Sequence, residues 1–158
     1  PFMSEGDALQ HMTKWIRQIA ADSDEISVNP MNIQRRTIVD RIFRHREYRP
    51  PWLWSLVQMI RNVHPDLHPD GEERTRLIVH PTAAGSIRGA HNCGRCDKEV
   101  AAAIERYSVS GSLLEFEGLS CDCEIKWTTE IALDTSLPMP LGSGLDRRLD
   151  SVEALLSP

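Results

Sequence analysis

The chain has 158 residues, which is enough for one domain with a buried core. Hydrophobic residues make up 41% and charged residues 26% of it, a balance that excludes a disordered or collagen-like chain. No apolar run approaches the ~20 residues of a membrane-spanning helix, and no basic and apolar series resembles a signal peptide. We therefore expect a folded chain with no membrane contact in a reducing intracellular compartment, the cytoplasm or the nucleus.

The net charge of −5 is unevenly distributed along the chain. Residues 35–95 carry an excess of basic side chains, whereas the segments before and after them are acidic. The basic central segment could bind an anionic partner, and the acidic C-terminal segment could bind a basic partner. The two segments could instead face each other within the fold. Charge therefore permits a nucleic-acid partner without selecting it.

Three helices are predicted in the first part of the chain. The first begins at Ser4, a good N-cap residue, and continues with apolar residues at helical spacing. Asn29 followed by Pro30 indicates the start of the second. The third, residues 52–63, is apolar nearly all round and needs a buried site or a partner. We expect these helices to form a bundle over residues 3–63.

The second part of the chain has a different character. Residues 64–73 are polar, with two prolines and a glycine, and predict a linker. A zinc-stabilised module with a small antiparallel sheet is expected over residues 74–134, with strands at 74–80, 113–116 and 121–133 and a helix at 97–107. Residues 135–158 predict a second linker and a C-terminal helix. The predicted fold class is α+β.

Four cysteines lie close together in the second half of the chain: Cys93, Cys96, Cys121 and Cys123. Two residues separate the first pair, and Gly94 suits the tight turn that lets both thiolates bind one ion. The second pair is two residues apart on a predicted strand, so both sulfurs point to one side. The four thiolates predict one structural zinc ion. Because they fill its coordination shell, no position remains for a catalytic water.

Other interpretations of the cysteines remain open. The arrangement resembles zinc ribbon and treble-clef knuckles in a general way, although its second pair has a shorter spacing. His91 lies two residues before Cys93 and could replace one cysteine as a ligand. Four buried free thiols are a further possibility. Cys93 and Cys96 could instead form a redox dithiol at the start of a helix, but this leaves the second pair unexplained.

The predicted second helix, residues 30–49, is the most basic segment. It could bind nucleic acid through arginine side chains, with Tyr48 beside them. Asp40 lies four residues from two of these arginines, which is also the spacing of ordinary surface ion pairs. The candidate nucleic-acid residues are Arg35, Arg36, Arg41, Arg44, Arg46 and Arg49.

Trp52 and Trp54 begin the apolar third helix. Large apolar side chains are usually buried in a core. Tryptophan is also common at the centres of protein interfaces, so both residues are candidates for binding a partner protein or a second copy of the chain.

No catalytic constellation stands out in the sequence. We therefore predict a non-enzymatic, zinc-stabilised binding or regulatory protein that acts through protein contacts, such as a viral accessory protein or a bacterial regulator. One alternative is a regulator that binds RNA or DNA through the arginine-rich helix. Another is a thiol-disulfide redox protein that uses Cys93 and Cys96.

Overall fold

The structure is a computed structural model and describes residues 3–136. Most of the segment predicted to form a second linker and a C-terminal helix, residues 135–158, lies outside the described residues. Helices and a small sheet are combined in one fold, as the α+β class requires. The elements in chain order are α1 (Glu5–Ala20), β1 (Glu25–Val28), α2 (Ile38–Arg44), α3 (Leu53–Leu67), η1 (Pro69–Gly71), β2 (Arg76–Val79), α4 (Asp97–Ser110), η2 (Leu113–Phe116) and α5 (Cys123–Ser136). Within these described elements, no helix is both long and apolar enough to cross a bilayer.

The sheet consists of two parallel strands, with Ile26 opposite Leu77 and Val28 opposite Val79. All four of these side chains are buried. The predicted antiparallel sheet is therefore wrong, and β1 was not predicted. Parallel pairing is possible because α2 and α3 lie between the strands in the chain and supply the long crossover that it needs.

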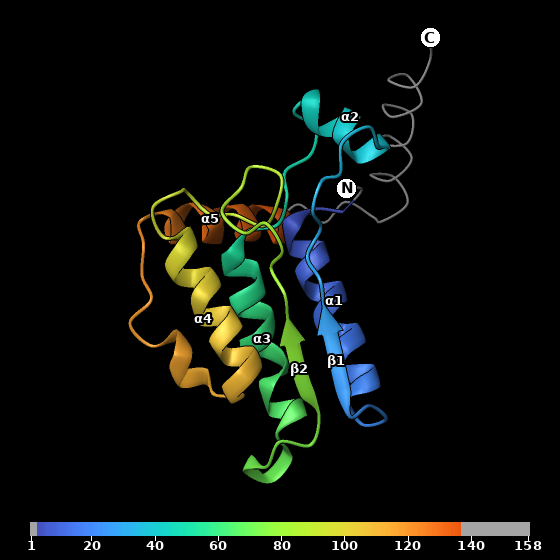
Figure 1. Cartoon of the computed structure of the whole chain (residues 1–158), viewed down its shortest axis with the longest axis vertical. Coiled ribbons are helices and arrows are strands. Elements are labelled where there is room, and N and C mark those ends of the chain that lie inside the picture. Colours follow the sequence, from blue (N-terminus) through green and yellow to red (C-terminus); the bar gives the residue numbers. More distant parts are fainter. Residues whose placement is uncertain (1–2, 137–158) are drawn as a thin grey trace.

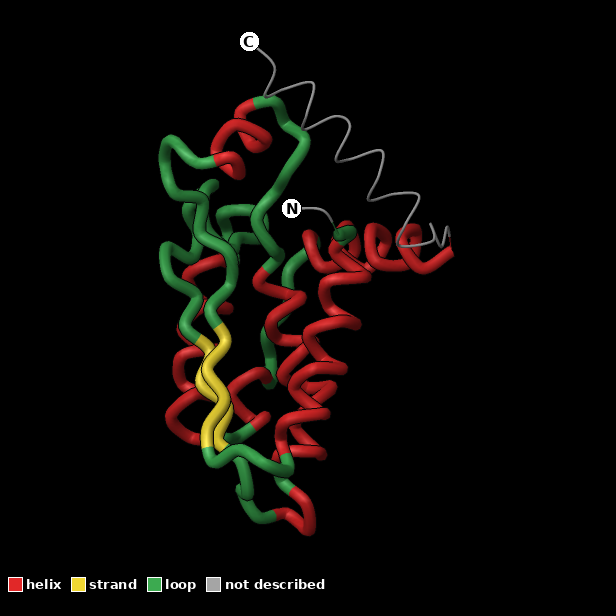
Figure 2. Tube along the Cα trace, turned by 90° about the vertical axis from the view of Figure 1, so that its right-hand side faces the viewer, coloured by secondary structure: helices red, strands yellow, loops and turns green. Residues whose placement is uncertain are grey.

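Helices α1, α3 and α4 run alongside this sheet, and α5 runs across one end of them (Figure 1, Figure 2). Helices α1 and α3 pack against each other, α4 packs against β2 and α3, and α5 packs on α1. Helix α2 stands apart at one end (Figure 1), so the predicted three-helix bundle is wrong. The sheet joins a strand from the segment predicted as a bundle, residues 3–63, to one from the segment predicted as a zinc-stabilised module, residues 74–134. The predicted linker, residues 64–73, contains the last turn of α3 and all of η1.

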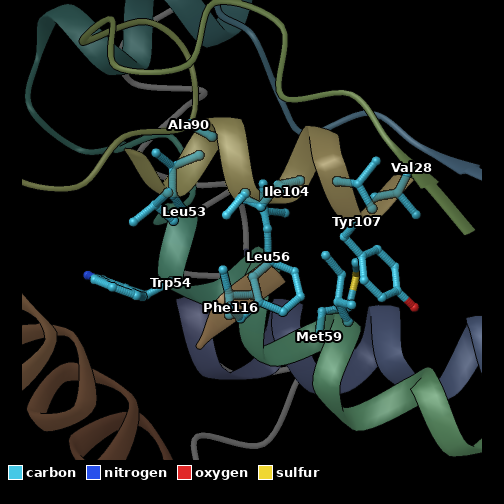
Figure 3. Packing of buried hydrophobic residues seen from close by; sticks show 14 of the residues in the cluster. Val28, Leu53, Trp54, Leu56, Met59, Ala90, Ile104, Tyr107 and Phe116 are labelled. Carbon is cyan, nitrogen blue, oxygen red and sulfur yellow. The ribbon is translucent and has the colours of Figure 1, made fainter. Parts of the chain in front are cut away.

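The core lies between the sheet, α3 and α4. Leu53 and Met59 of α3 meet Ile104 and Tyr107 of α4, and Val28 of β1 approaches from the sheet (Figure 3). These side chains are almost inaccessible to water, so the apolar third helix expected from the sequence is a central core element.

The predicted strand at 121–133 is a helix, α5. Its alternating pattern placed Ile125 and Leu133 on a buried face, but they are 72% and 56% exposed. The buried side chains are Cys123 and Trp127, four residues apart, which is helical spacing. Several apolar residues of this segment fit both the two-residue period of a strand and the 3.6-residue period of a helix. Packing against α1 selects the helix. The predicted strand at 113–116 is likewise wrong, because these residues form η2.

Helix α2 is much shorter than predicted and is anchored by a buried carboxylate. Thr37 is its N-cap, and the residues that were expected to begin it, including Asn29 and Pro30, form an extended loop. Asp40 accepts hydrogen bonds from the Arg36 backbone at 2.9 Å and from the Arg88 side chain at 2.7 Å. These bonds lower the pKa of Asp40 to about 2.

A partly buried carboxylate connects α1, α3 and α5. Glu5 accepts hydrogen bonds from the Trp52 backbone amide at 2.9 Å and from the Ser55 hydroxyl at 2.5 Å. Ser55 in turn accepts one from the indole of Trp127 at 2.8 Å. Burial raises the pKa of Glu5, although these hydrogen bonds oppose the shift. Its ionised form is therefore less favourable in the fold than in the unfolded chain.

The Glu5→Gln substitution tests this carboxylate. The amide oxygen of glutamine can accept the same hydrogen bonds without carrying a charge. Because the folded pKa is raised, the wild-type contribution is greatest at acid pH and is lost as the pH rises through that pKa. Glu5→Gln should therefore gain stability relative to wild type between pH 4 and pH 7, as measured by urea unfolding. Asp7→Asn, in the same helical turn, is the control. A difference that does not change with pH contradicts the prediction.

Candidate metal centre

The first cysteine pair forms a knuckle just before α4. Gly94 has a φ of 89°, in the left-handed region that favours glycine. The carboxylate of Asp97, the first residue of α4, accepts hydrogen bonds from the backbone amides of Asn92 at 2.8 Å and Gly94 at 2.6 Å. Asp97 is only 4% exposed. A buried carboxylate therefore closes the turn that carries Cys93 and Cys96.

The second pair is placed by the start of α5. Cys123 is the first residue of that helix, and the Cys121 carbonyl accepts a hydrogen bond from the Glu124 amide at 2.8 Å. The sulfurs therefore converge through a turn that leads into a helix. The strand geometry predicted for this pair is wrong, because Cys123 begins a helix and Cys121 lies in the turn before it.

The four sulfurs form one cluster. The Sγ atom of Cys93 is 4.0 Å from that of Cys96 and 3.6 Å from that of Cys121. The Sγ atoms of Cys96 and Cys123 are 3.6 Å apart, and all four lie within 4.8 Å of one another. Metal–sulfur bonds of about 2.3 Å in a tetrahedron separate the sulfurs by about 3.8 Å. The cluster therefore has dimensions that could hold a metal ion.

The electrostatic setting differs across the cluster. Hydrogen bonding from the backbone of Arg95, and from that of Cys96, lowers the pKa of the exposed Cys93 thiol to about 6. Burial raises the pKa of the Cys96 and Cys123 thiols. A buried thiolate is costly unless a positive charge compensates it, and a bound cation supplies that charge. The inner pair of sulfurs is thus the one that depends most on a metal.

Two side chains donate hydrogen bonds to these inner sulfurs. The indole Nε1 of Trp54 is 3.3 Å from the Sγ of Cys123, and the Nδ2 of Asn92 is 3.3 Å from the Sγ of Cys96. The Asn92 Oδ1 also accepts a hydrogen bond from the Trp54 backbone amide at 3.3 Å. Such donors orient ligands and disperse the charge of a metal–thiolate centre. They also attach the cluster to the first turn of α3.

The other predicted site residues are placed as follows. His91 is not in the cluster, and its Nδ1 is 2.9 Å from the Gly89 carbonyl. Trp52 and Trp54 are 3% and 2% exposed, so both belong to the core, the first of the two interpretations, and are not available as a partner-binding surface. Their indole groups donate inside the protein, Trp52 to Glu130 and Trp54 to Cys123.

The predicted arginine set divides into two groups. Arg49 is half-buried, stacks 3.8 Å over the Trp52 ring and donates to the His91 carbonyl at 2.6 Å, so it supports the cysteine knuckle. The other five are exposed around α2: Arg35, Arg36, Arg41, Arg44 and Arg46. The expected ion pair between Asp40 and Arg44 is present at 2.9 Å, whereas Arg36 reaches Asp40 through its backbone amide.

Two residues of the centre were not found from the sequence. Asn92 and Asp97 flank the first cysteine pair, and each makes more than one hydrogen bond there. An acidic residue directly after the second cysteine and at the start of a helix was the available signal for Asp97. Asn92 offered no recognised pattern, and its distant partner, Trp54, is brought to it only by the fold.

Comparison with known proteins gives two named relatives. The chain is 32% identical over 136 residues to an archaeosine synthase subunit beta from Methanosarcina acetivorans, covering 84% of this chain and 37% of that protein. It is 32% identical over 130 residues to the protein of the same name from Thermococcus kodakarensis, covering 80% of this chain and 38% of that protein. The chain thus spans well under half the length of these relatives.

The remaining comparisons add less. An uncharacterized protein from Methanocaldococcus jannaschii is 24% identical over 145 residues, covering 89% of this chain and 38% of that protein. No family model matches the chain, and no solved structure matches it.

These relatives correct the predicted function. They are named as subunits of an enzyme, so the prediction of a non-enzymatic regulatory protein is wrong, and they are archaeal proteins rather than viral ones. The chain covers 37% of the first of these subunits. The redox interpretation also fails to account for the gathering of all four sulfurs.

Asp97→Ala tests how the centre is supported. The change leaves the Asn92 and Gly94 amides without their acceptor, so we expect a loss of about 1–3 kcal/mol in the free energy of unfolding. Metal affinity, measured by chelator competition and elemental analysis, should fall about 10–100-fold. Glu99→Ala removes an exposed acid from the same helical turn and is the control. Equal effects of the two substitutions would contradict the assigned role of Asp97.

Proposed function

We propose that this chain is a segment of an archaeosine synthase beta subunit and that it helps the enzyme to hold its RNA substrate. The observation that carries the proposal is the identity of 32% over 136 residues, which extends over most of the chain. Archaeosine is a modified nucleoside, so an enzyme that makes it acts on a nucleic acid or its precursor. We infer that the substrate is a transfer RNA.

In this function the four cysteines hold one zinc ion, and the ion is structural. Four thiolates at these separations are a donor set that zinc accepts in a tetrahedron. With four sulfur ligands the ion has no open position for water or substrate. It therefore joins the segments that carry the cysteines and takes no part in a reaction. Cys93, Cys96, Cys121 and Cys123 would bind it and thereby join the start of α4 to the start of α5. The thiols need a reducing, intracellular environment to remain available.

The surface proposed to contact RNA is the arginine surface around α2, namely Arg35, Arg36, Arg41, Arg44 and Arg46. All five side chains are exposed, and α2 projects from one end of the molecule (Figure 1). The acid within this segment, Asp40, is 2% exposed and pairs with the side chains of Arg44 and Arg88, so its charge is directed to these two arginines and not to Arg35, Arg41 or Arg46. Exposed, clustered guanidinium groups suit the phosphates of a nucleic-acid backbone.

A protein partner also follows from the proposal, because the relatives are named as one subunit of a synthase. Trp52 and Trp54 are buried and cannot provide that contact. The partner must therefore bind another part of the surface.

A chimera tests the proposed function directly. The matched segment of the Methanosarcina relative is replaced by this chain, and the chimera is expressed in cells that lack the beta subunit. Archaeosine in total RNA, measured by mass spectrometry of nucleosides, should be restored. The same chimera with Cys123→Ser loses a sulfur ligand and should restore much less. A chimera that accumulates normally but makes no archaeosine would overturn the proposal.

The arginine surface gives a second prediction. The combined substitution of Arg35, Arg41 and Arg46 by alanine removes three phosphate-binding charges. The dependence of log affinity on log salt concentration should become shallower by about 2–3 for transfer RNA. Arg106→Ala, an exposed arginine on α4 that pairs with Glu115 at 2.7 Å, is the control and should change neither slope nor affinity. An unchanged salt slope in the triple variant would exclude this surface as the RNA site.

A further inference from the structure

The outer edge of β1 has backbone groups without partners in the described structure. The Arg76 amide donates to the Asp24 carbonyl at 2.9 Å, and the His80 amide donates to the Val28 carbonyl at 3.0 Å. Alternate residues of a strand direct their amide and carbonyl to opposite sides. Glu25 and Ser27 therefore direct theirs away from β2, and within residues 3–136 these groups accept and donate no backbone hydrogen bond.

The other edge of the sheet is closed. On β2, the Val79 amide donates to the hydroxyl of Ser108 at 2.9 Å, and that hydroxyl donates to the Val79 carbonyl at 3.2 Å. Ser108 belongs to α4, which packs along this strand. Helix α4 therefore covers the β2 edge, and among residues 3–136 the edge left open is that of β1.

The helix layer ends on the same side of the molecule as the free edge. Helix α1 is the outermost helix beside β1 (Figure 1). It exposes an apolar stripe at helical spacing: Met12 is 42%, Trp15 52% and Ile19 42% exposed. An amphipathic helix normally buries such a stripe. The sheet therefore ends at an edge to which another strand could be added, and the helix layer ends at an apolar surface that another segment could cover.

The unit that would continue them is another polypeptide strand with its own packing helix. Parallel sheets occur almost only within larger α/β arrangements, and two strands are few for one. The open face of this sheet carries three exposed polar side chains, Glu25, Ser27 and Arg76, and one half-buried apolar side chain, Ile78. This mostly polar face does not suit a stacked layer. The edge, rather than the face, fits a partner.

We propose that the β1 edge together with the α1 stripe is a docking surface for an α/β segment that adds a parallel strand beside β1. The occupant is the part of the longer protein that this chain lacks, since the chain spans 37% of the Methanosarcina relative. Backbone hydrogen bonds to Glu25 and Ser27 extend the sheet, and apolar side chains of the same segment cover Trp15 and its neighbours. The inference uses the proposed function only in taking this relative as an intact form of the chain.

Amide hydrogen exchange tests the free edge. In this chain alone, the Glu25 and Ser27 amides should exchange at least about 100-fold faster than those of Arg76 and His80, which are already bonded. In the intact Methanosarcina relative, the aligned outward amides should slow to within about 10-fold of the aligned inner ones. Fast exchange of the outward amides in the intact relative would overturn the proposal.

A charge placed on the helix stripe provides an independent readout. Trp15→Glu should leave the melting temperature of this chain nearly unchanged, because the residue is half exposed. Glutamate at the aligned position of the intact relative should lower its melting temperature by several degrees, because the site is covered there. Val109→Glu, at an 80% exposed position of α4, the helix that packs on β2, is the matched control and should be neutral in both proteins.

Two other outcomes would reject the proposal. Slow, concentration-dependent exchange of Glu25 and Ser27 in this chain alone would assign the edge to a second copy. A neutral glutamate at the Trp15 position of the intact relative would show that nothing covers the stripe. Neither measurement involves RNA or archaeosine, so the proposal can fail while the proposed function holds.

Discussion

The attachment of the cysteine cluster to the first turn of α3 is the interaction on which the rest of the structure depends. Trp54 donates its indole N–H to Cys123, while Asn92 bonds both the Trp54 backbone and Cys96. The cluster therefore holds α4 and α5 to the helix that forms the centre of the core. Burial of the inner sulfurs makes this arrangement dependent on a compensating charge, which couples metal binding to folding.

Polar groups carry much of the remaining specificity of the fold. Glu5 sits between α1 and α3, and the Trp127 indole of α5 reaches the same site through Ser55. Arg49 stacks on Trp52 and bonds the loop beside the first cysteine pair. A buried polar network of this kind is satisfied in only one arrangement of helices, whereas apolar contacts alone tolerate several. The cysteine cluster and this network are both attached to the first turn of α3, through Trp54 and Ser55, so they orient α5 together.

The surfaces proposed for function lie away from that rigid centre. The arginine surface lies on and around α2 at one end of the molecule, and the free edge of β1 lies beside α1 (Figure 1). The cysteine cluster, which could hold a metal ion, takes up neither of these surfaces.

Local signals in the sequence were sufficient where the interaction is local. The N-cap at Ser4, the apolar run of α3 and the spacing of Cys93 and Cys96 each act within a few residues, and these parts of the prediction agree with the structure. Strand β1 was missed because four residues carry little pattern. Residues 121–133 were misread because their apolar residues satisfy strand and helix periods alike, and burial of Trp127 against the core decides between them. The sequence by itself determined that four thiolates would be available at suitable spacings. Only the tertiary structure decided which surfaces remain open, because the exposure of Trp15, the burial of Trp54 and the free edge of β1 depend on contacts between residues far apart in the chain.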